Sequence, residues 1–152
     1  MTTRRETLKR SAVVAGLLAA TGLFPQYAAA AFNKSAFEAK NLADAFKALG
    51  IGTPVESPSV NLQAPDIAEN GAVVPVGATV ALAGVKQILF LVEKNPTALI
   101  AVFNLSDRVD AAISTRTKMA QSSDVYAVAV MNDGKVLYAK KEVKVTLGGC
   151  GG

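Results

Sequence analysis

The sequence predicts an all-β fold, an immunoglobulin-like β-sandwich of about seven strands with an N-terminal α-helix and a flexible C-terminal arm. Short apolar runs begin near residue 53 and are separated by Pro, Gly, Asn and Asp, which is typical of antiparallel sheets. Strand and helix patterns do not alternate, which argues against a parallel α/β sheet. A β-barrel is the alternative architecture. The absence of tryptophan and of a cysteine pair excludes an antibody-type core.

Residues 1–31 have the order of an export signal, in which a basic segment is followed by an apolar one and then by small residues. Arg4 and Arg5 form a twin-arginine pattern that departs from the usual form at Thr7, where phenylalanine is commonest. The apolar run is too short and too interrupted to span a bilayer, and the alanines at 28–31 offer cleavage sites. We therefore expect a Tat-type signal that is removed and a periplasmic protein, with an amphipathic or core helix as the alternative.

The remaining body, residues 32–147, has the length of one domain and begins with a predicted helix. Ser35 and Glu38 have the spacing of a capping box, apolar residues follow at helical spacing as far as Leu49, and Gly50 is placed to end the helix. This pattern predicts one amphipathic helix of about four turns whose apolar stripe packs against the core.

Seven strands are predicted after the helix, and residues 65–71 are predicted to form a loop. The strands span residues 60–63, 72–82, 86–93, 97–105, 109–119, 124–131 and 135–147.

Three of these strands carry specific expectations. Pro75 and Gly77 indicate an edge or a bulge in the second strand. Residues 88–92 are continuously apolar, so we expect the third strand to be buried on both faces. Asn-Asp-Gly at 132–134 predicts a tight hairpin turn before the seventh strand. That last strand alternates, with Val143, Val145 and Leu147 expected on its dry face.

The C-terminal tail contains the only cysteine of the chain, Cys150, between Gly148 and Gly149 on one side and Gly151 and Gly152 on the other. Because glycine permits most backbone conformations, we expect a flexible, solvated arm of residues 148–152 that carries a thiol at its tip, with Leu147 as the last fixed residue. Five extended residues reach roughly 17 Å, enough to present the sulfur to another protein. The alternative is a disordered tail with an incidental cysteine.

The chemistry of the chain argues for a carrier and against a self-sufficient enzyme. The sequence has no histidine, no metal-ligand cluster and no phosphate-binding loop. The terminal carboxylate lies two residues from Cys150 and disfavours its thiolate, so activation of the thiol is expected to come from a partner.

The net charge of +4 falls to +1 when residues 1–31, with four basic and one acidic residue, are removed. Nothing in the sequence argues for a nucleic-acid partner, a membrane partner, a metal or another cofactor. The three lysines near the end of the last strand, Lys140, Lys141 and Lys144, offer a docking surface for an acidic partner or, more simply, a solvated face.

The C-terminal segment VKVTLGGCGG, residues 143–152, resembles the SoxY family of sulfur carriers in the Sox sulfur-oxidation system. PDIAENG at 65–71, VVPV at 73–76, Asn95-Pro96 and the twin-arginine signal are also similar to that family. The resemblance covers nearly the whole body, and its most specific part is the GGCGG terminus. Thr7 is the one departure.

The resemblance implies a non-catalytic carrier of immunoglobulin-like fold that pairs with a SoxZ-like subunit as a heterodimer. It implies that Cys150 is conjugated to thiosulfate by a c-type cytochrome, SoxAX, and that the thiosulfohydrolase SoxB then releases sulfate. The sulfur dehydrogenase SoxCD, where present, would oxidise the remaining sulfur, and the intermediates would stay covalently on Cys150 without a cofactor.

Two other classes remain open at this point. One is an exported structural or binding sandwich whose tail thiol makes only intermolecular disulfides. The other is a ubiquitin-like sulfur carrier, which also ends in Gly-Gly but uses a terminal thiocarboxylate and would need neither Cys150 nor export.

Overall fold

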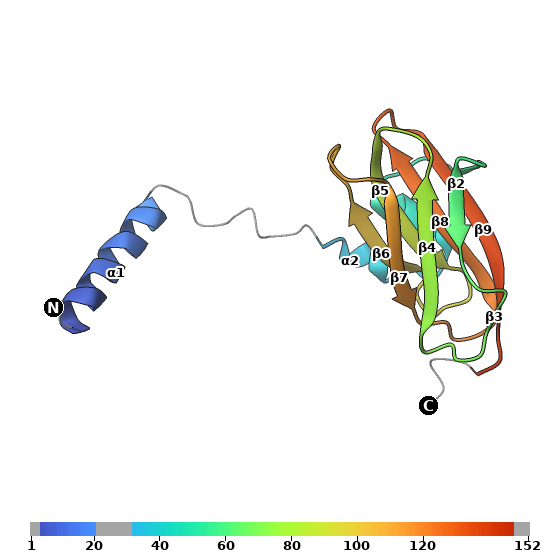
Figure 1. Cartoon of the computed structure of the whole chain (residues 1–152), viewed down its shortest axis with the longest axis horizontal. Coiled ribbons are helices and arrows are strands. Elements are labelled where there is room, and N and C mark those ends of the chain that lie inside the picture. The colour runs from blue at the N-terminus through green and yellow to red at the C-terminus, as the bar shows by residue number, and fades with distance from the viewer. Residues whose placement is uncertain (1–3, 21–31, 148–152) are drawn as a thin grey trace. The chain divides into compact units, whose positions relative to one another are not determined.

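The structure is a computed structural model that describes residues 4–20 and 32–147 (Figure 1). The chain divides into two compact units, residues 1–32 and 33–152. The described part of the first unit is one helix, α1 (Arg4–Ala20), which begins at the twin arginines. No helix among the described residues is both long enough and apolar enough to cross a membrane. The predicted cleavage sites at 28–31 lie outside the described residues, so removal of the signal stays a prediction.

The described part of the second unit is a β-sandwich of two sheets, which confirms the predicted fold class. One sheet has the order β1-β9-β8-β5-β6, with β3 also paired to β9, and the other has the order β2-β4-β7. Neighbours pair antiparallel except β1 and β3, which run parallel to β9. Two of the strands, β1 and β3, are only two residues long, so the longer strands number about seven as predicted. The strands are β1 (Val55–Glu56), β2 (Val60–Gln63), β3 (Ile67–Ala68), β4 (Val74–Val80), β5 (Val85–Val92), β6 (Leu99–Asn104), β7 (Ala112–Thr117), β8 (Ser123–Met131) and β9 (Val136–Val145).

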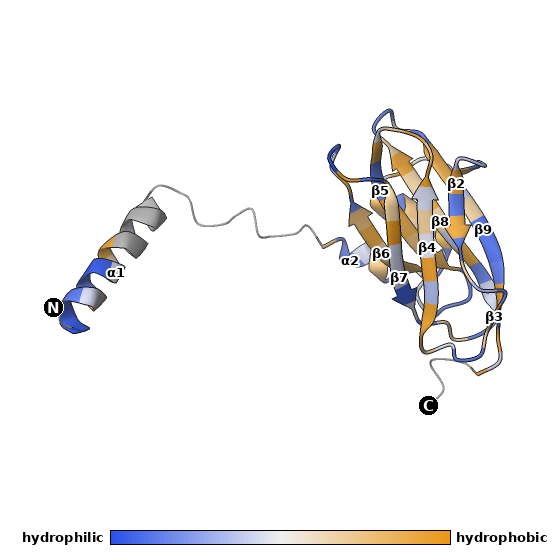
Figure 2. Cartoon of the chain, in the orientation of Figure 1, coloured by the Kyte–Doolittle hydropathy of each residue, from blue (hydrophilic) through white to orange (hydrophobic). Residues whose placement is uncertain are grey.

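The larger sheet is buried on both faces, as predicted for its strand β5. Ile88 and Phe90 point into the core between the two sheets, and Leu89 and Leu91 point to the other face, where the helices α2 and α3 cover it. All four side chains are at most 1% exposed. Figure 2 shows the apolar residues concentrated on the strands of the sandwich. Each fully buried side chain of this size stabilises the fold by about 1.5–3 kcal/mol. Because β5 contributes such side chains to both faces of its sheet, it is central to both cores.

The prediction of a single four-turn helix before the strands is wrong. The segment forms two helices, α2 (Lys34–Phe37) and α3 (Leu42–Leu49). The first is capped by Asn33 and the second by Asn41, whose side-chain oxygens accept hydrogen bonds from backbone N–H groups of the first turn at 3.1 and 2.8 Å. The expected Ser35–Glu38 capping box is therefore replaced by two asparagine caps.

The break between the two helices is fixed by contact with the sheet. The carbonyl of Ala39 accepts a hydrogen bond from the N–H of Ala98, at 2.9 Å, and therefore lies outside any helical ladder. Gly50 ends α3 with a φ of +65°, which confirms its predicted role as a stop signal.

The second predicted strand, β4, lies in the centre of its sheet, which corrects part of the prediction. Pro75 pairs only with β7, because β2 begins to pair at Gly77, so the edge expected at Pro75 is confirmed locally. Gly77 is in regular register on both sides and marks neither an edge nor a bulge. A Cβ there would lie 3.0 Å from Oε1 of Gln63 and 3.3 Å from the carbonyl oxygen of Ile113, a close approach that favours glycine.

The hairpin between β8 and β9 and most of the alternation in β9 are confirmed. Gly134 has a φ of +87° and donates its N–H to the carbonyl of Met131 at 3.0 Å. Val143 is fully buried and Val145 is half-buried, but Leu147 is 70% exposed, so its predicted place on the dry face is wrong. Leu147 lies two residues beyond the end of β9, so the alternation of the strand no longer sets the direction of its side chain.

Candidate functional site

The predicted site residues of the tail, Gly148, Gly149, Cys150, Gly151 and Gly152, lie outside the described residues. Leu147 is the last described residue before them. The structure therefore describes the base of the tail, which we define as residues 144–147. At the other end of the chain, the predicted signal residues Arg4 and Arg5 lie in the first turn of α1 and are exposed.

The tail base is held by the 65–71 loop, which contains β3. The N–H of Lys144 donates to the carbonyl of Asp66 at 3.0 Å, and the N–H of Thr146 donates to the carbonyl of Ala68 at 3.1 Å. The hydroxyl of Thr146 donates to the carbonyl of Glu69 at 2.9 Å. The loop therefore continues the sheet alongside the end of β9, and the prediction of a plain loop missed this parallel pairing.

A glycine in this loop connects the tail base to the rest of the sandwich. The N–H of Gly71 donates to the carbonyl of Leu147, and its own carbonyl accepts from the N–H of Met119, both at 2.7 Å. Met119 is fully buried. On the opposite side of β9, the hydroxyl of Ser122 accepts from the N–H of Val145 at 2.9 Å. Backbone hydrogen bonds thus anchor the chain as far as Leu147.

Two of the three lysines near the tail are engaged in ion pairs. Lys141 contacts Asp66 at 2.9 Å and donates to the carbonyl of Ala64 at 2.7 Å. Lys140 contacts Asp124 at 3.3 Å, and the hydrogen bond to that carboxylate raises the pKa of Lys140.

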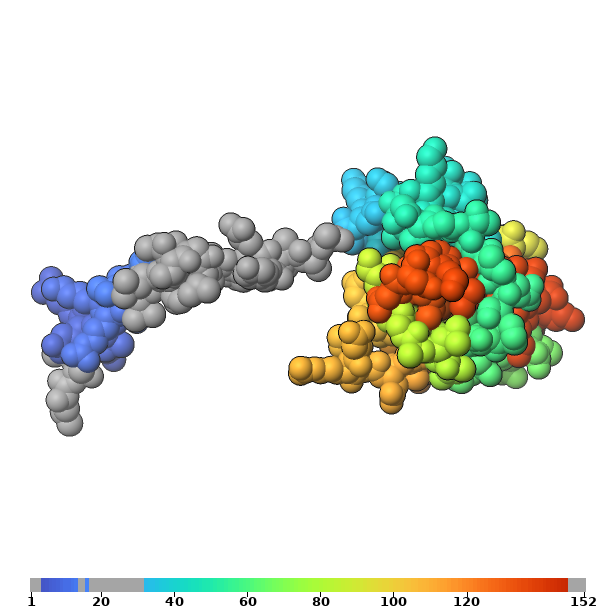
Figure 3. All heavy atoms as spheres, turned by 90° about the horizontal axis from the view of Figure 1, so that it is seen from above, coloured from blue at the N-terminus to red at the C-terminus, as the bar shows by residue number. Residues whose placement is uncertain are grey.

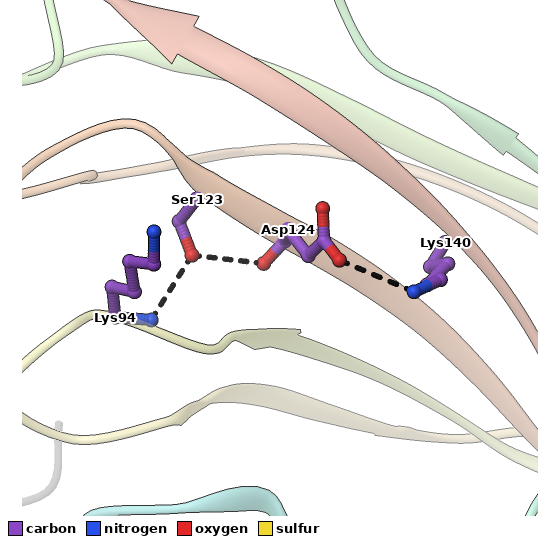
Figure 4. A network of polar contacts seen from close by, with 4 residues as sticks. All are labelled: Lys94, Ser123, Asp124 and Lys140. Carbon is purple, nitrogen blue, oxygen red and sulfur yellow. Dashed lines mark hydrogen bonds and ion pairs between the residues drawn. The ribbon is translucent and has the colours of Figure 1, made fainter.

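Figure 4 shows how the Lys140–Asp124 pair continues into a short network. The hydroxyl of Ser123 donates to the carbonyl of Asp124 at 3.1 Å and accepts from the N–H of Lys94 at 3.0 Å. Of Lys140, Lys141 and Lys144, only Lys144 makes no ion pair within the described part of the chain. This weakens the prediction that the three lysines together form a docking surface.

The described residues near the tail offer little acid–base or metal chemistry. The chain has no histidine, and within residues 4–20 and 32–147 no group of three or more Cys, Asp and Glu side chains could hold a metal ion. The Asp124 carboxylate and the Asp66 carboxylate each face a lysine. What the sequence could not indicate is the architecture of the tail base, because it depends on hydrogen bonds between residues far apart in the chain.

Comparisons with known proteins support a specific family. The family described as sulfur oxidation protein SoxY matches residues 46–150, so the match ends at Cys150. The solved structure of the sulfur carrier protein SoxY from Chlorobium limicola f thiosulfatophilum is 34% identical, with a TM-score of 0.60, and the match covers 69% of this chain and 96% of that one. A solved structure of the superoxide reductase neelaredoxin from Ignicoccus hospitalis has a TM-score of 0.52 at 17% identity, covering 57% of this chain and 79% of that one, and shares the fold only. None of the curated proteins matches.

Proposed function

The chain belongs to the SoxY family of sulfur oxidation proteins, and from this membership we propose that it is a periplasmic sulfur carrier whose Cys150 holds thiosulfate-derived sulfur covalently. The observation that carries the proposal is the family match, which extends over the sandwich and ends at the single cysteine. A sulfur carrier role for the family is supported by the similar protein from Chlorobium limicola.

The proposed cycle keeps every intermediate on one sulfur atom. The Cys150 thiol and thiosulfate form a new S–S bond while one proton and two electrons leave, the electrons passing to a SoxAX-type c-type cytochrome. Water then attacks the terminal sulfonate on a SoxB-type thiosulfohydrolase, which releases sulfate and two protons and leaves a persulfide anion on Cys150. A sulfur dehydrogenase of the SoxCD type, where present, oxidises that remaining sulfur.

The carrier role is consistent with the absence of histidine from the sequence and with the anchored tail base. Because the sequence contains no histidine, the proposal assigns the base and the oxidant to the partner enzymes. Cys150 is the third residue after Leu147, a reach of about 10 Å from the anchored tail base. Gly148, Gly149, Gly151 and Gly152 leave the sulfur accessible because they carry no side chain.

Membership of the SoxY family implies that the partners of this chain belong to the Sox system. Within the proposal, a SoxZ-like subunit pairs with the sandwich as a heterodimer, and the loading and processing enzymes act on the tail in turn. Export follows from Arg4 and Arg5, so an Arg4→Lys, Arg5→Lys variant is expected to remain in the cytoplasm as the precursor. Normal export of this variant would contradict the signal assignment.

The first experiment is the intact mass of the exported protein from cells supplied with thiosulfate, before and after reduction, followed by sequencing of the cysteine peptide. Sulfur-sized or thiosulfonate-sized additions on Cys150 that reduction removes are the expected result. The Cys150→Ser variant is expected to fold and to pair with its partner without carrying sulfur. An unmodified thiol, or a disulfide dimer alone, would instead favour the structural module.

A further inference from the structure

A cavity of about 690 Å³ opens at the end of the sandwich where β4 is joined to β5 and where β6 is joined to β7. It is lined by residues 79–85 of the first connection and by residues 106, 107 and 109–112 of the second. Figure 3 looks onto this end, from which the orange segment near residue 108 projects. We call it the far cavity, because the tail base lies at the opposite end of the sandwich.

The far cavity has apolar walls that continue onto the protein surface. Most of the residues that line it are alanine, valine, leucine or glycine. Two of the larger side chains are exposed, Leu82 by 43% and Val109 by 55%. One belongs to each connection, and exposed apolar surface beside a cavity is typical of sites where proteins interact. An occupant that covers both side chains has to extend beyond the cavity, as a segment of polypeptide does.

The charged side chains that line the far cavity are acidic. Asp107 and Asp110 both line it, and among its described lining residues there is no lysine or arginine, since Arg108 between them is not part of the lining. Within the described part of the chain, neither aspartate side chain makes a hydrogen bond or an ion pair, in contrast to Asp66 and Asp124. Two free carboxylates beside apolar walls are complementary to a side chain with a cationic end and an apolar stem, which describes arginine and lysine.

Backbone hydrogen bonds hold the two connections in place around the far cavity. The N–H of Val80 donates to the carbonyl of Ala111 at 2.9 Å, which joins one connection to the other. Gly84 turns the first connection with a φ of +80°, and its carbonyl accepts a hydrogen bond from the N–H of Asn132 at 2.8 Å. A surface that is formed before binding costs less ordering free energy when a partner binds.

The length of β4 separates the far cavity from the tail base. Gly71, three residues before β4 begins, bonds to the carbonyl of Leu147, whereas Val80 at the other end of β4 lines the cavity. A strand of this length spans roughly 20 Å, about twice the reach from Leu147 to Cys150. A protein bound at the far cavity therefore leaves the tail accessible to other proteins.

We propose that the far cavity is a docking site for a partner protein that inserts an arginine or lysine side chain into it. The cationic end of that side chain contacts Asp107 and Asp110, and apolar residues on either side of it in the partner cover Leu82 and Val109. Because the site is distant from the tail, such a partner stays bound while other proteins act on Cys150. The docking site involves no sulfur chemistry and is independent of the proposed function.

The recognition is tested with the Cys150→Ser variant, which cannot form disulfide dimers, and with a short capped peptide in which one arginine is flanked by leucines. We expect titration with the peptide to shift the backbone amide resonances of Leu82, Asp107 and Val109. The affinity is expected to fall as the salt concentration is raised, because salt screens contacts between exposed charges.

The contribution of charge is tested by changing each side of the contact. Replacing arginine by glutamine in the peptide, or combining Asp107→Asn with Asp110→Asn in the protein, is expected to weaken binding about fivefold, the size of two exposed charge contacts. The matched control combines Glu56→Gln with Glu142→Gln. Both glutamates are exposed and make no ion pair in the described part of the chain, so the control removes the same charge elsewhere and should leave binding unchanged.

The apolar contribution distinguishes a docked polypeptide from a small cation. The Leu82→Ser, Val109→Ser variant should keep the urea midpoint of unfolding, because both side chains are exposed, and should bind the peptide several-fold more weakly. Arginine amide alone should bind much more weakly than the peptide. If arginine amide bound as tightly as the peptide, or if the serine variant bound the peptide normally, the site would accept a small cation and the docking proposal would be wrong.

The remaining outcomes separate this proposal from the proposed function. An absence of peptide-induced shifts at the far cavity, or equal weakening by the glutamate control variant, would overturn the docking site. A failure of cells to load Cys150 would overturn the proposed function and leave the peptide titration as an independent result.

Discussion

Asn95 provides a direct test of how the end of the sandwich near the tail is held together. Its side chain bridges the turn before β6 and the segment after β7 with two hydrogen bonds, to the carbonyl of Lys118 and from the N–H of Ala120. The Asn95→Ala substitution removes both. The Asn95→Asp substitution keeps an acceptor for Ala120 and removes the donor to Lys118.

The magnitude follows from the exposure of each bond. A typical hydrogen bond contributes about 0.5–1.5 kcal/mol to stability, and the bond to Lys118 is solvent-exposed while that from Ala120 is partly buried. We therefore expect Asn95→Ala to lower the free energy of unfolding by about 1.5 kcal/mol, which corresponds to a decrease in Tm of roughly 6 °C for a domain of this length. Asn95→Asp should cost at least as much, because its second carboxylate oxygen would face the carbonyl oxygen of Lys118 without a proton between them.

Urea unfolding followed by circular dichroism measures the effect as a lower midpoint with an unchanged slope. The matched control is Asn61→Ala, because Asn61 is exposed on β2 and its side chain makes no hydrogen bond in the described part of the chain. If Asn95→Ala unfolded at the same urea concentration as the control, the bridging role of Asn95 would be wrong.

Three further predictions concern the sandwich and the tail. Gly77→Val should destabilise the protein by about 1–3 kcal/mol through overpacking against Gln63 and the Ile113 carbonyl, and Gln63→Ala should recover part of the loss in a double variant measured by urea unfolding; no recovery would contradict the close contact. Burial is the largest cause of a raised pKa for Tyr126, with Glu93 a further cause, so folding favours the neutral phenol. The stability that depends on the neutral phenol is fully present below the ordinary tyrosine pKa of 10.0 and is lost as the pH rises through the higher pKa of the folded state. When the pH is raised from about 8 to 11, the Tyr126→Phe variant should therefore lose less stability than the unsubstituted protein. Unfolding measured at each pH checks this. Gly149→Val should leave the midpoint of unfolding unchanged and slow thiosulfate loading by purified partner enzymes, because its side chain obstructs access to Cys150; normal loading would contradict the accessible-arm hypothesis.

The local features of the fold were predictable because each depends on residues close together in the chain. The run at 88–92 indicated burial on both faces of β5, and Gly50 and Gly134 marked a helix end and a turn through conformations that glycine adopts readily. The helix was mispredicted where a local pattern competed with a distant partner. Apolar spacing continued across residues 38–41, but the carbonyl of Ala39 bonds to Ala98 and interrupts the helix.

The candidate site divides in the same way. The single cysteine among four glycines at 148–152 was evident from composition and position, and these residues stay a prediction because they lie outside the described part of the chain. The anchoring of Leu147 by Gly71 was not evident, since two residues so far apart in sequence leave no periodic signal.

By itself, the sequence determined the class of fold and the atom that carries the proposed chemistry, because apolar periodicity, turn residues and a unique thiol are properties of the residues and their spacing. Only the tertiary structure decided that the 65–71 loop pairs with the end of β9, that Gly71 joins the tail base to Met119, and that Asn95 joins two loops. These arrangements depend on hydrogen bonds and packing between segments that meet after the two sheets close on each other, and residue spacing along the chain does not encode which distant segments will meet.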